Sequence, residues 1–209
     1  MSKLGLDNEK TIEVYDEIAD DYADYMYDKI MQYPLMKFTK FLPKTKRSEL
    51  KLLDVGCASG RDSQYLMEDG YDVIGIDLSK NMIKSAKKLV PKCKFENMDL
   101  AEMKYKDKTF NGIWDHATFC HVPKKHSILV LEEYNRVMKS GAILYIGLRE
   151  GEGEKMVIYE KSGNKPRFFS YYNMEELAKL LKKAGFEILE NFTEEEVNFR
   201  WVNVFAKKK

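Results

Sequence analysis

The stretch KLLDVGCASGRDS, from Lys51 to Ser63, decides the fold. It begins with a short apolar run, which predicts a strand buried on both faces. A glycine-containing turn follows, and the sequence RDSQYLMEDG after it predicts a helix that ends at Gly70. A strand, a glycine turn and a helix at the start of an α/β sheet provide an anchor for a ligand, because the turn and the helix N-terminus present free backbone N–H groups.

Strands and helices continue to alternate after this stretch. Further strands are predicted at 71–79, 93–99, 110–119 and 142–148, and helices at 80–90 and 124–139. Ser79 is expected to cap the first of these helices and Pro91 to stop it. Regular alternation predicts a Rossmann-like, doubly wound parallel sheet with helices on both faces, because each crossover is right-handed.

The two ends of the chain depart from this alternation. Residues 8–33 carry an apolar and aromatic stripe at helical spacing on an acidic background, which predicts one N-terminal helix interrupted at Pro34. In the last third, a Gly- and Lys-rich connection spans 150–166, and Asn173 with Glu176 forms a capping box for a further helix.

The closing strands are predicted at 186–192 and 200–206. The connection between them is too short for a crossover helix, so we expect them to pair antiparallel. Dinucleotide-binding domains do not usually end in this way.

Composition narrows the class of protein. The 209 residues include 35 basic and 34 acidic side chains, so no strong overall field attracts nucleic acid or an anionic membrane. No apolar run approaches the roughly 20 residues that span a bilayer, and the first ten residues lack the apolar core of a signal peptide. The sequence therefore predicts a cytoplasmic protein that does not enter the membrane.

Cysteine and histidine spacing gives no support to a disulfide framework or a metal site. Cys57, Cys93 and Cys120 are an odd, widely spaced set. The three histidines recur every five residues, which does not place them on one helix face as metal ligands. We expect no bound metal.

The glycine turn is a poor dinucleotide site. The pattern G-x-G-x-x-G would place glycines where the sequence has Gly56, Ala58 and Arg61, so only the first is present. Gly56 and Gly60 instead frame a compact space. Asp77 ends the second strand and lies at the lip of the same cleft, where a carboxylate suits a ribose diol.

Four segments together resemble the class I S-adenosylmethionine-dependent methyltransferases: LLDVGCASGRDS, GIDLS, NMDL with Asp99, and EYNRVMKSGAILYI. The resemblance runs from about Val14 to Ala206. It implies an α/β fold with a seven-stranded, mostly parallel sheet and an antiparallel last strand, which agrees with the antiparallel pair expected at the end of the chain. It also implies that S-adenosyl-L-methionine is the cofactor and S-adenosyl-L-homocysteine the product.

The resemblance implies a single methyltransferase domain over residues 1–209. Within it, 1–48 would form a helical cap, 49–148 the cofactor-binding core, and 149–209 a substrate-side insertion with the closing strands.

The same resemblance implies which residues contact the cofactor. Asp77 would bind both ribose hydroxyls, and Asp99 with Leu100 would meet the amine edge of adenine. The core residues implied as contacts are Asp54, Gly56, Cys57, Ala58, Ser59, Gly60, Asp77, Leu78, Met82, Asp99, Leu100 and Asp115. A structural interpretation stays open for the glycines, which would then only form a tight turn, and for Met82, which at helical spacing fits an ordinary core.

Three stretches are candidates for the roof of the acceptor pocket. In the N-terminal helix, Tyr15 and Tyr22 are predicted to close over the cofactor and Tyr25 over the substrate, although such a stripe also fits helix packing. His116 and His121 are candidate bases, because histidine titrates near neutrality.

The third stretch joins LREGEGEK to PRFFSYY, a late segment that resembles one subset of small methyltransferases. Arg149, Arg167 and Tyr171 are the candidate substrate contacts, because arginine beside aromatic rings suits an anionic or planar acceptor. The alternative is that Arg167 pairs with a surface acid while the aromatics pack beneath the insertion.

Three functions remain open on the sequence. The first is methylation of a small molecule, anionic or aromatic. The second is a tRNA methyltransferase of the wobble-uridine type, disfavoured by the near-zero net charge. The third is a non-catalytic S-adenosylmethionine-binding protein. The acceptor atom and the oligomeric state are not specified.

Overall fold

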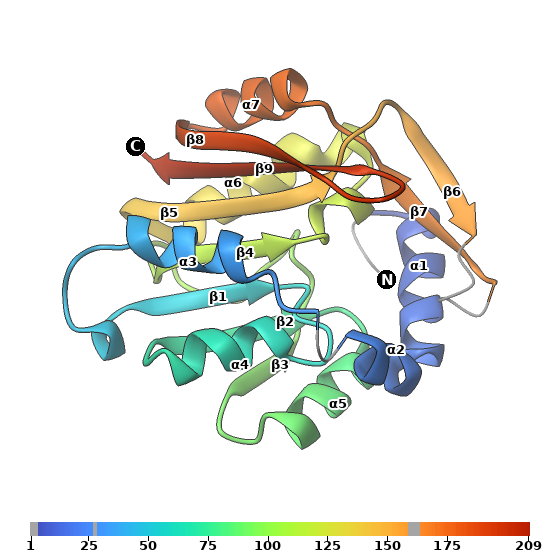
Figure 1. Ribbon diagram of the computed structural model, residues 1–209, viewed down its shortest axis with the longest axis horizontal. Helices are drawn as coiled ribbons and strands as arrows, with labels where there is room; N and C mark the ends of the chain where they lie inside the picture. Colours follow the sequence, from blue (N-terminus) through green and yellow to red (C-terminus); the bar gives the residue numbers. More distant parts are fainter. Residues whose placement is uncertain (1–3, 27–28, 159–163) are drawn as a thin grey trace.

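The computed structural model describes residues 4–26, 29–158 and 164–209, without the side chains of residues 6 and 7. Positions 27–28 of the predicted N-terminal helix and 159–163 of the predicted connection lie outside the described residues. Figure 1 shows a central sheet with helices on both faces and a separate pair of strands beside one end of it.

The central sheet has seven strands in the order β3-β2-β1-β4-β5-β9-β8. Their bounds are β1 Lys51–Val55, β2 Asp72–Asp77, β3 Lys94–Asn97, β4 Phe110–His116, β5 Met138–Arg149, β8 Phe186–Glu195 and β9 Arg200–Lys208. β1 pairs parallel with β2 and β4, and β4 with β5, whereas β9 runs antiparallel to both β5 and β8. The predicted Rossmann-like sheet with an antiparallel last strand is confirmed.

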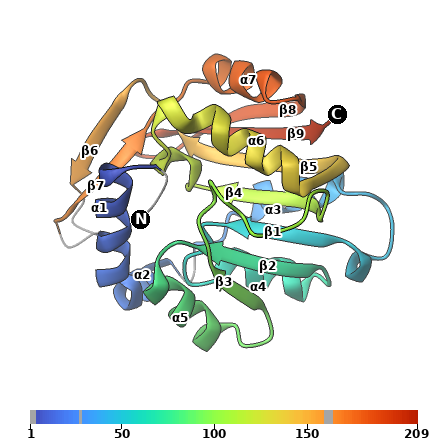
Figure 2. The same cartoon turned by 180° about the vertical axis from the view of Figure 1, so that it is seen from behind.

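Helices cover both faces of this sheet (Figures 1 and 2). The helices are α1 Leu6–Glu17, α2 Ala19–Met26, α3 Gln32–Phe41, α4 Arg61–Glu68, α5 Lys80–Leu89, α6 Ser127–Val137 and α7 Met174–Lys183. On one face, Phe38 of α3 and Leu66 of α4 pack against Trp114. On the other, Leu131 of α6 and Leu181 of α7 join a second core. None of the described helices is both long and apolar enough to span a membrane.

Two helix starts follow the expected capping chemistry. Ser79 Oγ accepts a hydrogen bond from Met82 N at the start of α5. Asn173 Oδ1 accepts one from Glu176 N at the start of α7. These caps satisfy N–H groups that have no partner within the helix, which is why they can be read from the sequence.

The N-terminal region differs from the single helix that we predicted. The stripe divides into α1 and α2, with Ile18 between them. Pro34 lies within the first turn of α3 and does not interrupt a helix, because proline's missing N–H is not needed there. Leu35 and Phe38 are fully buried against the sheet, so α3 covers a sheet face and only α1 and α2 stand over the strand ends.

The late connection holds a hairpin that sequence patterning did not reveal. β6 Glu154–Ile158 pairs antiparallel with β7 Pro166–Ser170 in a separate two-stranded sheet. β7 packs against α1, and four of its five residues are buried. Figure 1 shows α1, β6 and β7 side by side near the carboxyl ends of β1 and β4. The contact between β7 and α1 supports strand formation here, and the β-propensity of the local sequence does not include such a contact.

Candidate active site

The loop between β1 and α4 is held in a compact shape by backbone hydrogen bonds, one to β2 and one within the loop. Cys57 N donates to the carbonyl of Ile76 on β2 at 3.0 Å, and Gly60 N donates to the carbonyl of Cys57 at 2.8 Å. Gly56 has φ 65°, and a Cβ there would overlap the Thr118 side chain. Glycine at this position is therefore needed for packing, whatever ligand the loop holds.

Asp77 ties this loop to the end of β2. Its Oδ2 accepts a hydrogen bond from Ala58 N at 3.0 Å, and its Oδ1 accepts one from Ser79 N at 2.8 Å. Burial raises the pKa of Asp77 to about 6. An ionised carboxylate has about four lone-pair sites, so each oxygen keeps room for another donor.

Asp54 forms the floor beneath the loop. It is buried, and Ser63 Oγ donates to its Oδ2 at 2.6 Å. Burial, together with the nearby charge of Asp62, raises the pKa of Asp54 to about 8. Asp62 is itself paired with Arg61 at 2.7 Å. A ligand ammonium group beside Asp54 would favour its charged form.

A cavity of about 640 Å³ lies where α1 and α2 face these strand ends. This volume is in the range of small-molecule and cofactor sites, about 300–1,000 Å³. The cavity brings together these residues that the sequence singled out: Asp54, Gly56, Cys57, Ala58, Ser59, Asp77, Leu78, Asp99, Leu100, Tyr15, Tyr22, Tyr25, His116, His121, Arg149 and Arg167. Their individual roles stay predictions.

Four other predicted residues do not reach the cavity wall: Gly60, Met82, Asp115 and Tyr171. Met82 is only 1% exposed within the core. Asp115 is fully buried, and its carboxylate accepts hydrogen bonds from Thr118 N, Phe119 N and the Tyr134 hydroxyl. In this arrangement Asp115 supports the β4 loop and does not face a ligand.

On the far side of the cavity, α1 is linked to β7 through a buried arginine. Arg167 is 8% exposed, and its Nη1 donates to the Tyr15 hydroxyl at 2.6 Å. The guanidinium also lies 5.0 Å from the centroid of the Tyr15 ring and 5.6 Å from that of Phe169. Arg167 is thus held among aromatic rings at the cavity wall.

His121 has both ring nitrogens engaged by the protein. Nδ1 lies 2.7 Å from the Phe168 carbonyl oxygen, which only accepts, so Nδ1 carries the hydrogen. Nε2 lies 3.0 Å from the Tyr15 hydroxyl and accepts from it. Burial, helped by the charges of Arg167 and Arg149, lowers the pKa of His121 to about 4. Because both ring nitrogens already have protein partners, this geometry weakens the prediction that His121 is a base.

His116 occupies a different wall of the cavity. Its ring lies 4.7 Å from that of Trp201, and its Nδ1 lies 3.4 Å from the Tyr145 hydroxyl. Burial lowers the pKa of His116 to about 4, so the imidazole is neutral at pH 7. Nearby, the Arg149 guanidinium lies 4.0 Å from the centroid of the Phe199 ring.

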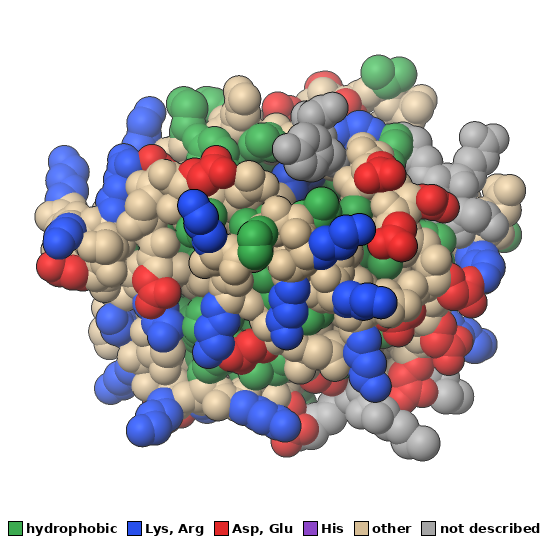
Figure 3. Space-filling model, turned by 90° about the horizontal axis from the view of Figure 1, so that it is seen from below, with side chains coloured by type: hydrophobic (Ala, Val, Ile, Leu, Met, Phe, Trp, Pro, Cys, Tyr) green, Lys and Arg blue, Asp and Glu red, His purple; other side chains and the backbone are tan. Residues whose placement is uncertain are grey.

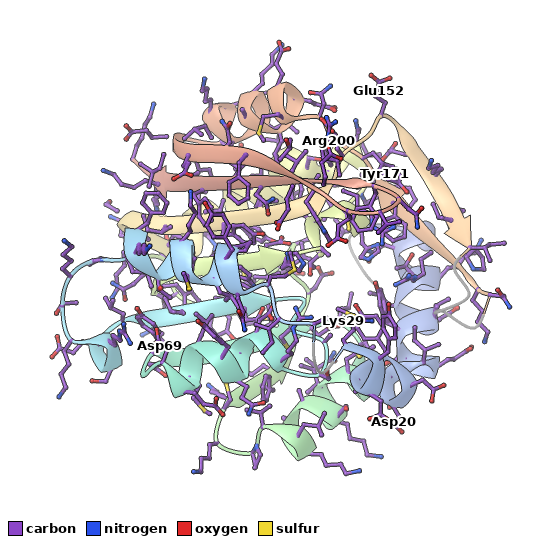
Figure 4. All side chains as sticks on the ribbon, viewed as in Figure 1. Asp20, Lys29, Asp69, Glu152, Tyr171 and Arg200 are labelled. Carbon is purple, nitrogen blue, oxygen red and sulfur yellow. The ribbon has the colours of Figure 1, made fainter. Side chains whose placement is uncertain are left out.

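The cavity also has wall residues that sequence reasoning missed. They include Lys29, Arg61, Met98, Thr118, Phe199 and Trp201. Figure 4 shows Lys29 between α2 and the strand ends, whereas Asp20 points away from them. Arg61 stands within the glycine-turn motif and was therefore detectable. Phe199 comes from the β8–β9 turn and Trp201 from the start of β9, and no local sequence pattern predicts that these segments approach the cavity.

The residues present fit S-adenosylmethionine. The cavity offers carboxylate acceptors in Asp77 and Asp99, apolar side chains in Leu78, Met98 and Leu100, and the buried acid Asp54 at the loop. These suit hydroxyl and amine donors, a flat base and an ammonium group, respectively. Among the described residues, no group of three or more His, Cys, Asp or Glu is placed to hold a metal ion.

Comparison with known proteins agrees with this fit. Residues 53–146 match the family described as "Methyltransferase domain". Phosphoethanolamine N-methyltransferase 3 of Arabidopsis thaliana is 32% identical over 145 residues, which are 66% of this chain and 29% of that protein. The chain thus spans less than a third of the length of this relative.

Solved structures show the same fold. A SAM-dependent methyltransferase from Methanosarcina mazei has a TM-score of 0.73 and 22% identity, over 82% of this chain and 96% of that one. The 1,6-didemethyltoxoflavin-N1-methyltransferase of Burkholderia thailandensis, solved with 1,6-didemethyltoxoflavin and S-adenosylhomocysteine, has a TM-score of 0.74 and 18% identity, over 100% and 93%.

Proposed function

We propose that this chain, which carries a methyltransferase domain at residues 53–146 in a class I fold, transfers a methyl group from S-adenosylmethionine to a small, anionic or planar acceptor. One observation carries the proposal. The same cavity is lined at one end by residues 56–59 of the glycine loop with Asp77, and at the other by Arg149 and Arg167 among aromatic rings. Donor and acceptor would therefore share one enclosed space.

The cofactor end supplies complementary polar groups. The Asp77 carboxylate, held by Ala58 N and Ser79 N, would accept hydrogen bonds from both ribose hydroxyls. Asp99 would accept from the adenine amine, and Asp54 would face the ammonium group. When bound, S-adenosylmethionine supplies a methyl group on a positively charged sulfur, and displacement at that carbon needs alignment and exclusion of water.

The acceptor end favours negative charge and flat rings. Arg149 and Arg167 both contribute positive charge that lowers the pKa of His121, so their fields overlap in this part of the cavity. The rings of Phe199 and Trp201 pack edge to face at 5.3 Å and form a further wall. Arginine binds carboxylate and phosphate well and stacks on planar groups. The name of the Arabidopsis relative, a phosphoethanolamine methyltransferase, agrees with an anionic acceptor.

The RNA alternative has less support. Figure 3 shows acidic and basic side chains interspersed over the face seen from below, without a continuous basic track. A net charge of +1 adds no long-range attraction for phosphate. Binding of bulk tRNA at low salt would revive this alternative.

Calorimetry with S-adenosylmethionine and S-adenosylhomocysteine tests cofactor binding, which must precede methyl transfer. We expect both to bind, and Asp77→Asn to weaken binding while the protein stays folded. Methyl transfer is then measured against a panel of phenols, carboxylates, amines and thiols. Absence of cofactor binding would refute the proposal, and tight binding without transfer to any member would leave the non-catalytic interpretation.

A further inference from the structure

Four polar side chains form a row across the sheet, from the cavity toward β8. Neighbouring strands contribute them: His116 of β4, Tyr145 of β5, Asn203 of β9 and Glu194 of β8. In the strand register, Gly147 of β5 lies opposite both His116 and Asn203. A Cβ at Gly147 would overlap the Tyr145 oxygen and lie 2.9 Å from His116 Nδ1. The missing side chain therefore leaves room for the Tyr145 hydroxyl between its two neighbours.

The hydrogen bonds in this row have a consistent direction. The Tyr145 hydroxyl donates to Asn203 Oδ1 at 2.7 Å. Asn203 Nδ2 and Glu194 Oε2 are buried, and each lacks a hydrogen-bond partner among the described residues. Glu194 pairs with Trp201 in the register, so it is a diagonal neighbour of Asn203 on the same face. The amide orientation follows from the Tyr145 bond, in which Oδ1 is the acceptor and Nδ2 points away from the Tyr145 hydroxyl.

This direction selects one tautomer of His116. The Tyr145 hydrogen is used by Asn203, so the Tyr145 oxygen is the acceptor in its 3.4 Å contact with His116 Nδ1. Nδ1 then carries the hydrogen, and Nε2 keeps its lone pair. His116 lines the cavity while its Nδ1 lies beside the Tyr145 hydroxyl, so Nε2 is the ring nitrogen left for a ligand.

Charged groups around His116 come from several elements. Asp62 and Arg61 of α4 act on its pKa in opposite directions, and burial is the largest effect. Arg149 of β5 lies two residues beyond Gly147 on the same face of the strand and also lines the cavity. The neutral His116 ring thus shares the cavity wall with the Arg149 guanidinium, which would stabilise an anion, and the Trp201 ring is tilted by 37° against the imidazole.

We propose that His116 is the catalytic base of this site, that Tyr145 and Asn203 position it, and that the acceptor is a planar molecule whose reacting oxygen or nitrogen carries a proton. This rests on the proposed function. As the acceptor's O–H or N–H bond breaks, the proton goes to His116 Nε2 and the electron pair forms the bond to the methyl carbon. The pair of the C–S bond stays on sulfur, and His116 later releases the proton to water.

The tautomer is tested without any substrate. Nitrogen-15 NMR of histidine side chains can be assigned by substitution, because the chain has three histidines. We expect His116 to be neutral at pH 7 with hydrogen on Nδ1, and Tyr145→Phe to mix the two tautomers of His116 while His121 keeps its own. A hydrogen on Nε2 of His116, or a charged ring at pH 7, would overturn the assignment even if cofactor binding succeeds.

Transfer to two phenolic probes, catechol and 4-hydroxybenzoate, tests the chemistry. For a probe that is methylated, His116→Gln is expected to lower the single-turnover rate by about 10²–10⁴-fold near neutrality. The remaining rate should rise with pH toward the pKa of the phenol, because only ionised acceptor then reacts.

The control His126→Gln, at a histidine outside the cavity wall, should leave rate and pH profile unchanged. S-adenosylhomocysteine affinity should stay within threefold in His116→Gln, which separates loss of the base from misfolding. An unchanged pH profile in that variant, or no methylation of either phenol by a wild-type protein that methylates other panel members, would refute the proposal. Failure of wild-type cofactor binding would instead refute the proposed function.

Discussion

The two ends of the cavity are built in different ways. The cofactor end consists of strand ends and one loop that lie close together in the sequence. The hydrogen bond from Ala58 N to Asp77, for example, joins the loop after β1 to the end of β2. The acceptor end joins segments far apart in the chain: Tyr15 contacts Arg167 across 152 positions and His121 across 106. A site whose parts come from successive βα units is encoded locally, whereas the other exists only once the whole chain has folded.

The two ends also differ in their electrostatics. At the cofactor end, burial raises the pKa of Asp54 and Asp77, and a bound ligand that donates hydrogen bonds or carries positive charge would lower these pKa values again by stabilising the ionised carboxylates. At the acceptor end, burial lowers the pKa of His116 and His121, which keeps both rings neutral beside arginine. This difference agrees with the proposed division of the cavity into a site for a cationic donor and a site for an anionic acceptor.

The largest effect is expected from Asp77→Ala. It removes a carboxylate that organises the loop through Ala58 N and Ser79 N and would also hold the ribose. Because hydrogen bonds to charged groups contribute about 1.5–3 kcal/mol each, S-adenosylhomocysteine should bind about 100-fold more weakly or worse in calorimetry. Asp77→Asn, which keeps the shape of the side chain, should lose less S-adenosylhomocysteine affinity. Equal affinity in Asp77→Ala and wild type would show that this end does not bind the cofactor.

Arg167→Met is the corresponding change at the acceptor end. It keeps most of the side-chain bulk but removes the charged donor to the Tyr15 hydroxyl. The apparent KM for the best anionic acceptor should rise about thirtyfold, in line with about 2 kcal/mol for a charged hydrogen bond. Cofactor affinity should stay within threefold. A loss of cofactor affinity as large as that of Asp77→Ala would contradict the division of the cavity into two ends.

Sequence patterning predicted the cofactor end well because its determinants are local. The run from Lys51 to Ser63 specifies strand, turn and helix, and Asp77 follows from the end of the next strand. Residues 54–59 of that run and Asp77 line the cavity. The family resemblance implied that Met82 and Asp115 contact the cofactor, whereas the structure buries both in the interior, because side-chain direction depends on packing that the sequence pattern does not report.

The acceptor end was only partly predictable. Arg167 and the aromatic residues after it were identified, but the hairpin that presents them was not. The approach of Trp201 to His116 depends on the pairing of β9 with β5, which a local pattern does not encode. The direction of the hydrogen bonds at His121, which decides whether it can act as a base, follows only from its contacts with Tyr15 and Phe168.

Acidic pH should weaken the cofactor end selectively. The pKa of Asp77 is raised to about 6 in the free protein, and the ribose hydroxyls need its ionised form as acceptor. Protonation therefore competes with binding, so affinity should be constant above about pH 7 and about tenfold lower near pH 5. In Asp77→Asn, S-adenosylhomocysteine affinity should depend less on pH over this range. The same steep dependence in that variant would assign the titration to another group.

The smallest effect is expected from Met82→Leu. This change tests whether Met82 contacts the cofactor, as the family resemblance implies, or only packs in the core, as the structure shows. Met82 is 1% exposed and does not line the cavity, whereas Met98 does. A volume-conserving change in the core costs less than about 1.5 kcal/mol, so the protein should stay folded and bind S-adenosylhomocysteine within twofold of wild type. Met98→Ala should weaken binding more, because it removes apolar surface at the predicted adenine site. If instead Met82→Leu binds tenfold more weakly with an unchanged thermal midpoint, the Met82 side chain contacts the cofactor and the cavity opens further toward α5 than the free structure shows.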